Sequence, residues 1–402
     1  MAFTLLLPFF LYSLILQTIY VVAKTRITIA IGDSFTADTG NSPWLLSPSG
    51  DFAFGFLPIQ DTDHFLLSIW YAKIYEKTVV WYANGDSPAP KGSKVELTAN
   101  DGLVLTSPNG DKLWNTTEGL RSVGVSRGVL NDTGNFVLVD GEFKSQWETF
   151  NFPSDTLLPS QVLHKGGSLS SRLKETNFSK GRFELLLQNI GSLVMHSINL
   201  PSGYVNVENY YESETVGTQL VFDGSGDLYL LRENNEKYYV SKEEVKVSTS
   251  NFYLRATLNF DGVFTLLKHP KRSTDSGGWT IVWSQPENIC HYFPKLGSGV
   301  CGYNSYCSLG ENKRPTCQCR KSYSLVDSDD PFGNCKPHFI HGCAEDELSE
   351  TKDLYYSKIL NGTYWHQNDY TLLKPFTEKQ CKLACMEDCM YYYLFIFWHI
   401  DI

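Results

Sequence analysis

The segment SPSGDFAFGF, residues 47–56, contains the pattern that decides the fold. A turn of small and polar residues ends at Gly50, and apolar residues then alternate along the chain. Similar units follow at residues 101–105, 134–138, 226–230 and 261–266. Each unit predicts a turn that opens a strand with one buried face. Because one unit cannot bury its own face, several must share a core.

The composition agrees with an all-β, multidomain protein. The 402 residues include 34 Lys+Arg and 44 Asp+Glu, so the formal net charge is −10, which argues against a nucleic-acid binder. Hydrophobic residues make up 42% and charged residues 19%, which is typical of a folded chain. Aromatic residues at 14%, with 31 Gly, favour short strands and tight turns. The length predicts two to four domains.

The N-terminal residues predict an exported protein. Residues 3–16 form an apolar run, and small Ala23 follows as a cleavage position, so residues 1–23 are interpreted as a signal peptide and excluded from the fold. A retained membrane anchor is the alternative, but the run is shorter than the roughly 20 residues that a spanning helix needs. The apolar stretch Tyr391–Ile400 is shorter still.

Four N-glycosylation sequons support export to the extracellular space. Each has Ser or Thr two positions on and no intervening Pro, and the acceptors are Asn115, Asn131, Asn177 and Asn361. The predicted location is therefore secreted or extracellular, or the outer face of the plasma membrane if the chain is part of a longer single-pass receptor.

All ten cysteines lie between Cys290 and Cys389. The preceding part must therefore be held together by an apolar core, whereas the last part is predicted to be disulfide-stapled. Spacing alone leaves fifteen pairings open for the first six cysteines. Zinc binding is the alternative, but no histidine stands at finger-like spacing.

The segment WETFNFPSDTLLPSQ, residues 147–161, predicts the boundary between two blocks of the cysteine-free part. Pro153 and Pro159 interrupt regular strand pairing there. An ordered loop within one domain is the alternative interpretation.

Particular stretches resemble the bulb-type lectin region of plant G-type lectin S-receptor-like serine/threonine kinases. They are SPSGDFAFGF, IWYAKI at 69–74, KTVVWYANGDSP at 77–88 and WETFNFPSDTLLPSQ. The later cysteine-rich segments resemble, in that family's order, an EGF-like and a PAN-type module.

The resemblance implies an all-β fold with two tandem β-prism domains, each of three small antiparallel sheets. The implied organisation is a signal peptide at 1–23, lectin domain 1 at 24–150, lectin-like domain 2 at 151–285, an EGF-like module at 286–336 and a partial PAN-like module at 343–402.

The EGF-like resemblance implies the disulfide pairs Cys290–Cys307, Cys301–Cys317 and Cys319–Cys335. The PAN-like resemblance implies that Cys343 pairs with Cys389, which leaves Cys381 and Cys385 without partners. That family has another cysteine where this chain has Tyr391.

The mannose pocket of bulb-type lectins is a strand that reads Gln-x-Asp-x-Asn-x-Val-x-Tyr. The corresponding series here is Asn131, Thr133, Asn135, Val137 and Val139, so Asn135 and Val137 are the candidate ligand-binding residues. The series 98–106, 223–231 and 259–267 retain less of the pattern. Because most hydrogen-bonding groups are lost, weak or no mannose binding is expected. No metal or cofactor is implied.

The predicted function is extracellular recognition of a mannose-type glycan or of a protein or peptide partner, without catalysis. The alternative is a structural or dimerising ectodomain, or a decoy fragment, with no sugar binding. No kinase motif of the GxGxxG, His-Arg-Asp or Asp-Phe-Gly type occurs in these residues. His64, His164 and His196 are scattered and predict no catalytic site.

Overall fold

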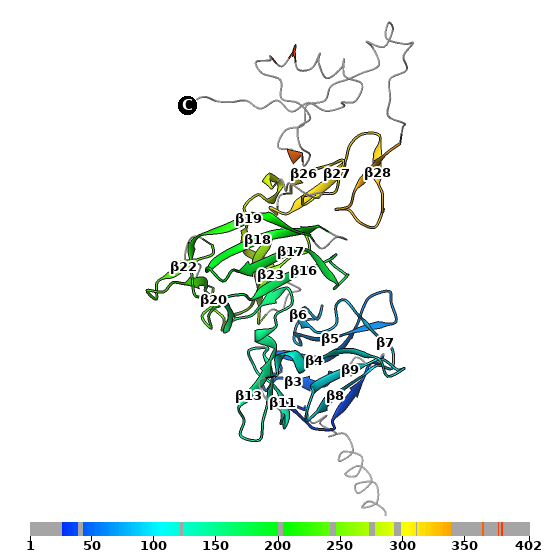
Figure 1. The fold of residues 1–402 in the computed structure, drawn as a ribbon, viewed down its shortest axis with the longest axis vertical. Helices are drawn as coiled ribbons and strands as arrows, with labels where there is room; N and C mark the ends of the chain where they lie inside the picture. The colour runs from blue at the N-terminus through cyan, green and yellow to red at the C-terminus, as the bar shows by residue number, and fades with distance from the viewer. Residues whose placement is uncertain are drawn as a thin grey trace, which may run out of the picture. The chain divides into compact units, whose positions relative to one another are not determined.

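The regular secondary structure of the computed structural model is almost entirely β-strand (Figure 1). It describes residues 26–38, 43–120, 124–199, 204–241, 247–272, 278–292, 299–310, 312–338, 364–365, 377 and 379–380. Its helical elements within those ranges are short, and the three 3-10 turns are η1 (Thr117–Gly119), η2 (Thr149–Asn151) and η3 (Ile289–His291). The all-β prediction is confirmed.

Three antiparallel sheets form the first block. The first sheet is β1 (Thr28–Ala30), β11 (Arg127–Leu130), β12 (Phe136–Val139) and β13 (Ser145–Glu148). The second is β10 (Lys112–Asn115), β9 (Gly102–Thr106), β8 (Lys94–Thr98) and β2 (Ser34–Thr36). The third is β3 (Leu45–Leu46), β4 (Phe52–Pro58), β5 (His64–Tyr71) and β6 (Val79–Tyr82), with β7 (Ala89–Pro90) paired to β5.

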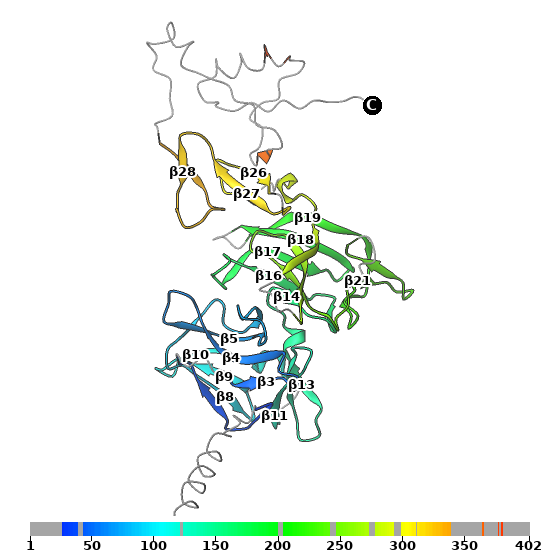
Figure 2. The same cartoon turned by 180° about the vertical axis from the view of Figure 1, so that it is seen from behind.

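The second block has the same number of sheets, each of four strands in a comparable order. Figure 2 shows it in green, with β14, β16, β17, β18, β19 and β21 labelled. Its sheets are β14 (Thr156–Leu157), β23 (Phe252–Leu258), β24 (Phe264–Pro270) and β25 (Thr280–Gln285); β15 (Gln161–His164), β20 (Gln219–Phe222), β21 (Leu228–Leu231) and β22 (Lys237–Tyr239); and β16 (Ser168–Arg172), β17 (Lys180–Leu187), β18 (Ser192–Asn199) and β19 (Tyr204–Val216). Two prisms of three sheets each are thereby confirmed.

The chain divides into two compact units near Val162, and the short segments 176–179 and 222–226 group with the first unit. The predicted limits of the individual domains remain predictions.

Three tryptophans close the core of the first block. Trp81 on β6, Trp114 on β10 and Trp147 on β13 each come from a different sheet. Their ring centroids lie 5.9 to 6.2 Å apart, and every pair meets edge to face. Such edge-to-face pairs are a favourable aromatic geometry. One aromatic cluster therefore joins all three sheets.

In the second block, the strand positions that match these three tryptophans in the sheet pairing carry one tryptophan and two tyrosines. Trp147 pairs with a leucine of β12, and Trp283 pairs likewise with a leucine of β24. On the other two sheets, the matching positions hold Tyr238 and Tyr211. Burial raises the pKa of Tyr211, and Tyr238 adds to that rise. The prism is thus kept while its aromatic centre changes.

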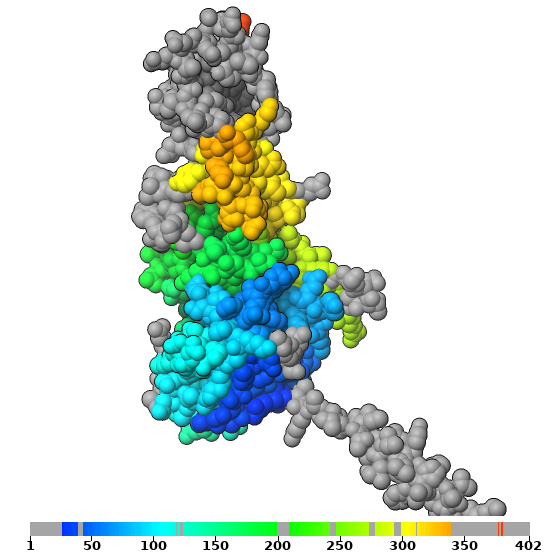
Figure 3. Space-filling view, turned by 90° about the vertical axis from the view of Figure 1, so that its right-hand side faces the viewer, coloured from blue at the N-terminus to red at the C-terminus, as the bar shows by residue number. Residues whose placement is uncertain are grey.

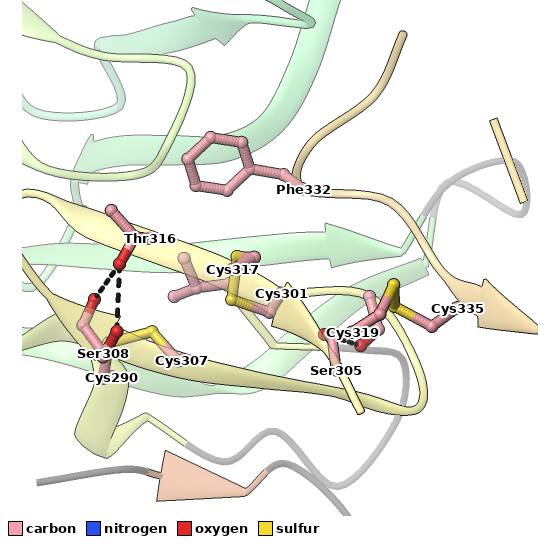
Figure 4. Close-up of a disulfide and its surroundings, with 12 residues drawn as sticks. Cys290, Cys301, Ser305, Cys307, Ser308, Thr316, Cys317, Cys319, Phe332 and Cys335 are labelled. Atoms are coloured by element: carbon pink, nitrogen blue, oxygen red, sulfur yellow. Dashed lines mark hydrogen bonds between the residues drawn. A yellow bond between two sulfur atoms is a disulfide. The ribbon is translucent and has the colours of Figure 1, made fainter. Parts of the chain in front are cut away.

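A disulfide-rich module follows the second block. Its strands are β26 (Ser305–Leu309), β27 (Pro315–Cys319), β28 (Tyr323–Leu325), β29 (Cys335–Pro337) and β30 (Tyr364–Trp365). The disulfides join Cys290 to Cys307, Cys301 to Cys317 and Cys319 to Cys335, the same pairs that the EGF-like resemblance implies (Figure 4). The predicted PAN-like cysteines Cys343, Cys381, Cys385 and Cys389 lie outside the described residues.

Candidate functional site

The strand that carries the candidate sugar residues begins at a tightly bonded turn. The backbone N–H of Asn131 donates to the carbonyl of Asn135 (2.9 Å), and that of Gly134 donates to the carbonyl of Asn131 (3.0 Å). Gly134 has φ +84°, and a Cβ there would lie 2.6 Å from a Leu158 methyl group. Because only glycine fits this conformation without strain, the turn geometry is fixed by the sequence.

Asn135 is 7% exposed, and its side-chain amide is bonded within the protein. Its Nδ2 donates to Glu148 Oε2 (2.8 Å). Its Oδ1 accepts hydrogen bonds from Thr149 Oγ1 (3.0 Å) and from the Phe150 backbone N–H (3.2 Å). These bonds tie the start of β12 to η2. An amide used in this way has lost most of its capacity to bind sugar hydroxyls.

Val137, the second candidate, is 9% exposed and is classed with the core of the first block. It lies opposite Val129 on β11 and Glu148 on β13, in the middle of its sheet. The structure thus places Val137 on β12 and Asn135 directly before that strand, and it buries both residues. Their role as ligand-binding residues remains a prediction.

The exposed part of the same turn is Asn131, Asp132 and Thr133. Asp132 Oδ1 accepts a hydrogen bond from the Ser49 backbone N–H (2.7 Å). Burial works to raise the pKa of Asp132, but hydrogen bonds from Ser49 and Ser47 and the charge of Lys73 outweigh it and hold that pKa below its usual value. Asp132 is therefore a carboxylate that anchors the turn.

The second series of the first block, on β8 and β9, also uses its polar groups internally. Thr98 Oγ1 donates to the Gly102 carbonyl and accepts from the Asp101 N–H, both at 3.2 Å. Thr116 Oγ1 donates to the Asp101 carbonyl (3.1 Å) and accepts from the Leu103 N–H (3.0 Å). Sequence reasoning did not identify Thr116, whose contribution depends on the neighbouring strand.

The series that opens β21 in the second block uses its aspartate for hydrogen bonds within its own turn. Asp223 Oδ1 accepts hydrogen bonds from the Ser225 hydroxyl (2.6 Å), the Ser225 N–H (3.0 Å) and the Gly226 N–H (3.1 Å). This is the local bonding by which aspartate stabilises a turn.

The series that opens β24 differs, because its central carboxylate carries an ion pair. Asp261 has a 2% exposed side chain, and Arg314 lies 2.5 Å from its Oδ2. Asn259 Nδ2 donates to the Val263 carbonyl (2.7 Å) and to Thr265 Oγ1 (2.9 Å). Burial raises the pKa of Asp261, and the charge and hydrogen bonds of Arg314 oppose that rise.

Three of the four predicted glycosylation acceptors lie among the described residues. Asn131 and Asn177 are exposed and Asn115 is half-buried. The Oδ1 atoms of Asn115 and Asn177 each accept a hydrogen bond from the backbone N–H two residues on, at 2.9 and 3.0 Å. Asn361 lies outside the described residues. Glycosylation at these positions remains a prediction.

The histidines occupy separate places. His196 is 5% exposed, and its Nε2 lies 2.9 Å from Glu184 Oε2 on the paired strand β17. The pKa of Glu184 is lowered, with the hydrogen bond from His196 as the largest cause. His64 and His164 are exposed on other strands. The described residues hold no group of three or more metal-ligating side chains. Nor do they contain a helix long and apolar enough to cross a membrane.

Comparison with protein families gives two matches. Residues 78–180 match the family described as D-mannose binding lectin, and residues 216–326 match the S-locus glycoprotein domain.

Full-length relatives give the clearest similarity. The chain is 39% identical over 399 residues to the G-type lectin S-receptor-like serine/threonine-protein kinase RLK1 of Arabidopsis thaliana, which covers 93% of this chain and 47% of that protein. It is 37% identical to LECRK2 of Oryza sativa subsp. japonica, a kinase with the same description, over 91% of this chain and 46% of the relative. The chain thus spans about half the length of these relatives.

Solved structures give more distant matches. One is a monomeric monocot mannose-binding lectin from Gastrodia elata, at 18% identity and a TM-score of 0.23, covering 34% of this chain and 99% of that one. Another is the two-domain, fetuin-binding Scilla campanulata agglutinin, at 17% identity and a TM-score of 0.23, covering 64% of this chain and 93% of that one.

Proposed function

The chain is homologous to the lectin-bearing region of the G-type lectin S-receptor-like serine/threonine-protein kinases, and from this premise we propose that it is an extracellular recognition region that performs no catalysis. The predicted signal peptide and the predicted sequons support secretion or display outside the plasma membrane. This chain spans about half the length of the relatives, so we propose kinase activity only for those longer proteins and not for this chain.

We propose further that the partner is an extracellular protein or peptide rather than free mannose. The observation that carries this choice is the amide of Asn135, which is 7% exposed and bonded to Glu148, Thr149 and Phe150. A sugar would have to break these bonds, and each broken bond costs about 0.5–1.5 kcal/mol net. A monosaccharide site offers few other contacts to offset that loss.

Mannose binding is the second candidate, and the D-mannose binding lectin match at residues 78–180 favours it. In that case the sugar would use the exposed part of the turn, Asn131 and Thr133, beside β12. A dimerising ectodomain without a ligand is the third.

Calorimetric titration of the secreted, glycosylated chain with methyl α-mannoside separates these candidates. We expect no saturable heat up to about 10 mM, which corresponds to an affinity weaker than the millimolar range. Saturation below about 1 mM that is lost in Thr133→Ala and kept in Asn131→Gln, which removes the same predicted sequon, would contradict the proposal. Both substituted residues are exposed, so folding is not at issue. Light scattering on the same sample tests for a dimer.

A further inference from the structure

The turns 131–135 and 259–263, one in each block, have the same backbone geometry. In the turn 131–135, Gly134 donates to the residue three positions earlier, and the first and last residues are joined by an N–H to carbonyl bond of 2.9 Å. In the turn 259–263, the same two bonds measure 2.9 and 3.1 Å. Gly134 has φ +84° and Gly262 has φ +85°. Each turn joins the second and third strands of the corresponding sheet.

The surroundings of the two turns are different. Thr133, third in the first turn, is exposed to solvent. Asp261, third in the second turn, is 2% exposed. Both Nε and Nη2 of Arg314 lie 2.5 Å from Asp261 Oδ2. Arg314 stands between β26 and β27 of the EGF-like module, so a residue of that module covers the second turn.

An apolar contact surrounds this ion pair. Val263 of the turn belongs to one buried cluster with Ile289, Val300 and the disulfide-bonded Cys290, Cys301 and Cys307. Phe260 meets Phe332 of the module edge to face, with ring centroids 5.3 Å apart. In Figure 3 the yellow and orange atoms of the module lie against the green atoms of the second block.

Hydrogen bonds extend the contact to two other strands. Arg182 on β17 donates from Nη2 to the Val300 carbonyl (2.7 Å). The hydroxyl groups of Ser197 on β18 and Tyr292 lie 3.2 Å apart. Burial lowers the pKa of Arg182, and the charge of Asp330 in the module opposes that decrease.

We propose that the turn 259–263, which in the lectin pattern would face a sugar, is a permanent docking site for this chain's own EGF-like module, with Arg314 on Asp261 as its central contact. The second block and the module then unfold as one cooperative unit. A ligand then has no access to the turn 259–263, because the module covers it. This proposal is independent of the proposed function, because it concerns a contact within the chain.

A thermal double-mutant cycle on the full secreted chain tests the docking. Arg314→Gln leaves the buried Asp261 carboxylate without its cation. We expect the transition of the second unit to fall by about 6–20 °C, since breaking a buried pair is strongly destabilising. Asp261→Asn combined with Arg314→Gln removes both charges, and we expect it to recover at least half of that loss. Arg232→Gln, which breaks the exposed pair with Glu236, is the matched control and should shift the transition by less than about 2 °C.

Three results would overturn the proposal. One is an Arg314→Gln shift no larger than that of Arg232→Gln. Another is a wild-type chain in which the second block and the module melt separately. If Arg314→Gln fails to fold, the double variant decides: a folded double variant supports the docking, and failure of both contradicts it.

Discussion

The turns 131–135 and 259–263 show how one backbone unit can serve two purposes in one molecule. Both depend on a glycine at positive φ and on the same pair of backbone hydrogen bonds. The first leaves Asn131, Asp132 and Thr133 exposed, whereas the second has its carboxylate covered by Arg314. The local sequence therefore fixes the shape of a turn, and residues far away in the chain decide what the turn does.

The carboxylates of the two turns also titrate in opposite directions. The pKa of Asp261 is raised by burial, and Arg314 only partly opposes this. Burial acts on Asp132 in the same sense, but hydrogen bonds from Ser49 and Ser47 prevail and its pKa is lowered. Local hydrogen bonds are enough to keep the carboxylate of an exposed turn ionised, whereas the carboxylate of a covered turn needs a partner cation.

The largest effect expected is the pH dependence of Arg314→Gln. At neutral pH the variant should lose about 3–5 kcal/mol, because a buried carboxylate is left unpaired. Without Arg314, burial is opposed only by backbone hydrogen bonds to Asp261, so the pKa of Asp261 rises further above the usual 3.8. As the pH falls through this raised pKa, the carboxyl group becomes neutral and the penalty shrinks. Denaturant unfolding of wild type and variant from pH 7 to 4 measures this difference in the free energy of unfolding. A penalty that is constant over that range would contradict this account.

Next in size are alanine substitutions at the two glycines. A Cβ at Gly134 would lie 2.6 Å from a Leu158 carbon, and one at Gly262 would lie 2.8 Å from carbons of Ile289 and Phe183. Left-handed strain and overpacking together predict losses of about 2–5 kcal/mol for each variant. Gly134→Ala should lower only the transition of the first unit, and Gly262→Ala only that of the second, as seen by calorimetry.

Gly110→Ala is the matched control for these two variants. Gly110 has φ +91° but nothing within 4 Å of a Cβ, so only the strain of about 1–2 kcal/mol is expected. Equal losses in all three variants would show that crowding does not contribute.

The smallest effect expected is that of Asn135→Ala. It leaves the Thr149 hydroxyl and the Phe150 N–H without their shared acceptor, and a buried unsatisfied group costs about 1–3 kcal/mol. The loss should appear in the first unit by chemical denaturation, with no change in the second. A variant as stable as wild type would show that this amide is free for a ligand after all.

The sequence predicted much of this fold because its determinants are local. Turns ending in glycine at positions 50, 102, 134, 226 and 262 all have positive φ, and apolar alternation after them marks strands. The resemblance to an EGF-like module implied the three disulfide pairs that are observed, whereas cysteine spacing alone left fifteen pairings open. The joint presence of Trp81, Trp114 and Trp147 in one cluster was not predicted, since pattern reasoning within a strand says little about which side chains of different sheets meet.

The site was less predictable, because its residues are defined by distant partners. The pattern singled out Asn135, which lies directly before β12, but it did not predict the bonds of Asn135 to residues 13 to 15 positions later. The series 259–267 was recognised only as a weak match to the sugar pattern, and Arg314, which pairs with Asp261 of that series, lies 53 residues further along the chain. A buried acid beside a glycine turn is the signal that a covering cation exists, but burial is not visible in the sequence.

Carboxyl footprinting of the native, secreted chain tests the central claim most directly. Carbodiimide coupling, read by mass spectrometry, reports how accessible each carboxylate is. The docked arrangement predicts that Asp132 is labelled readily while Asp261 is protected, and that Asp261 becomes reactive in Arg314→Gln. Equal labelling of Asp132 and Asp261 in the wild-type chain would contradict the account.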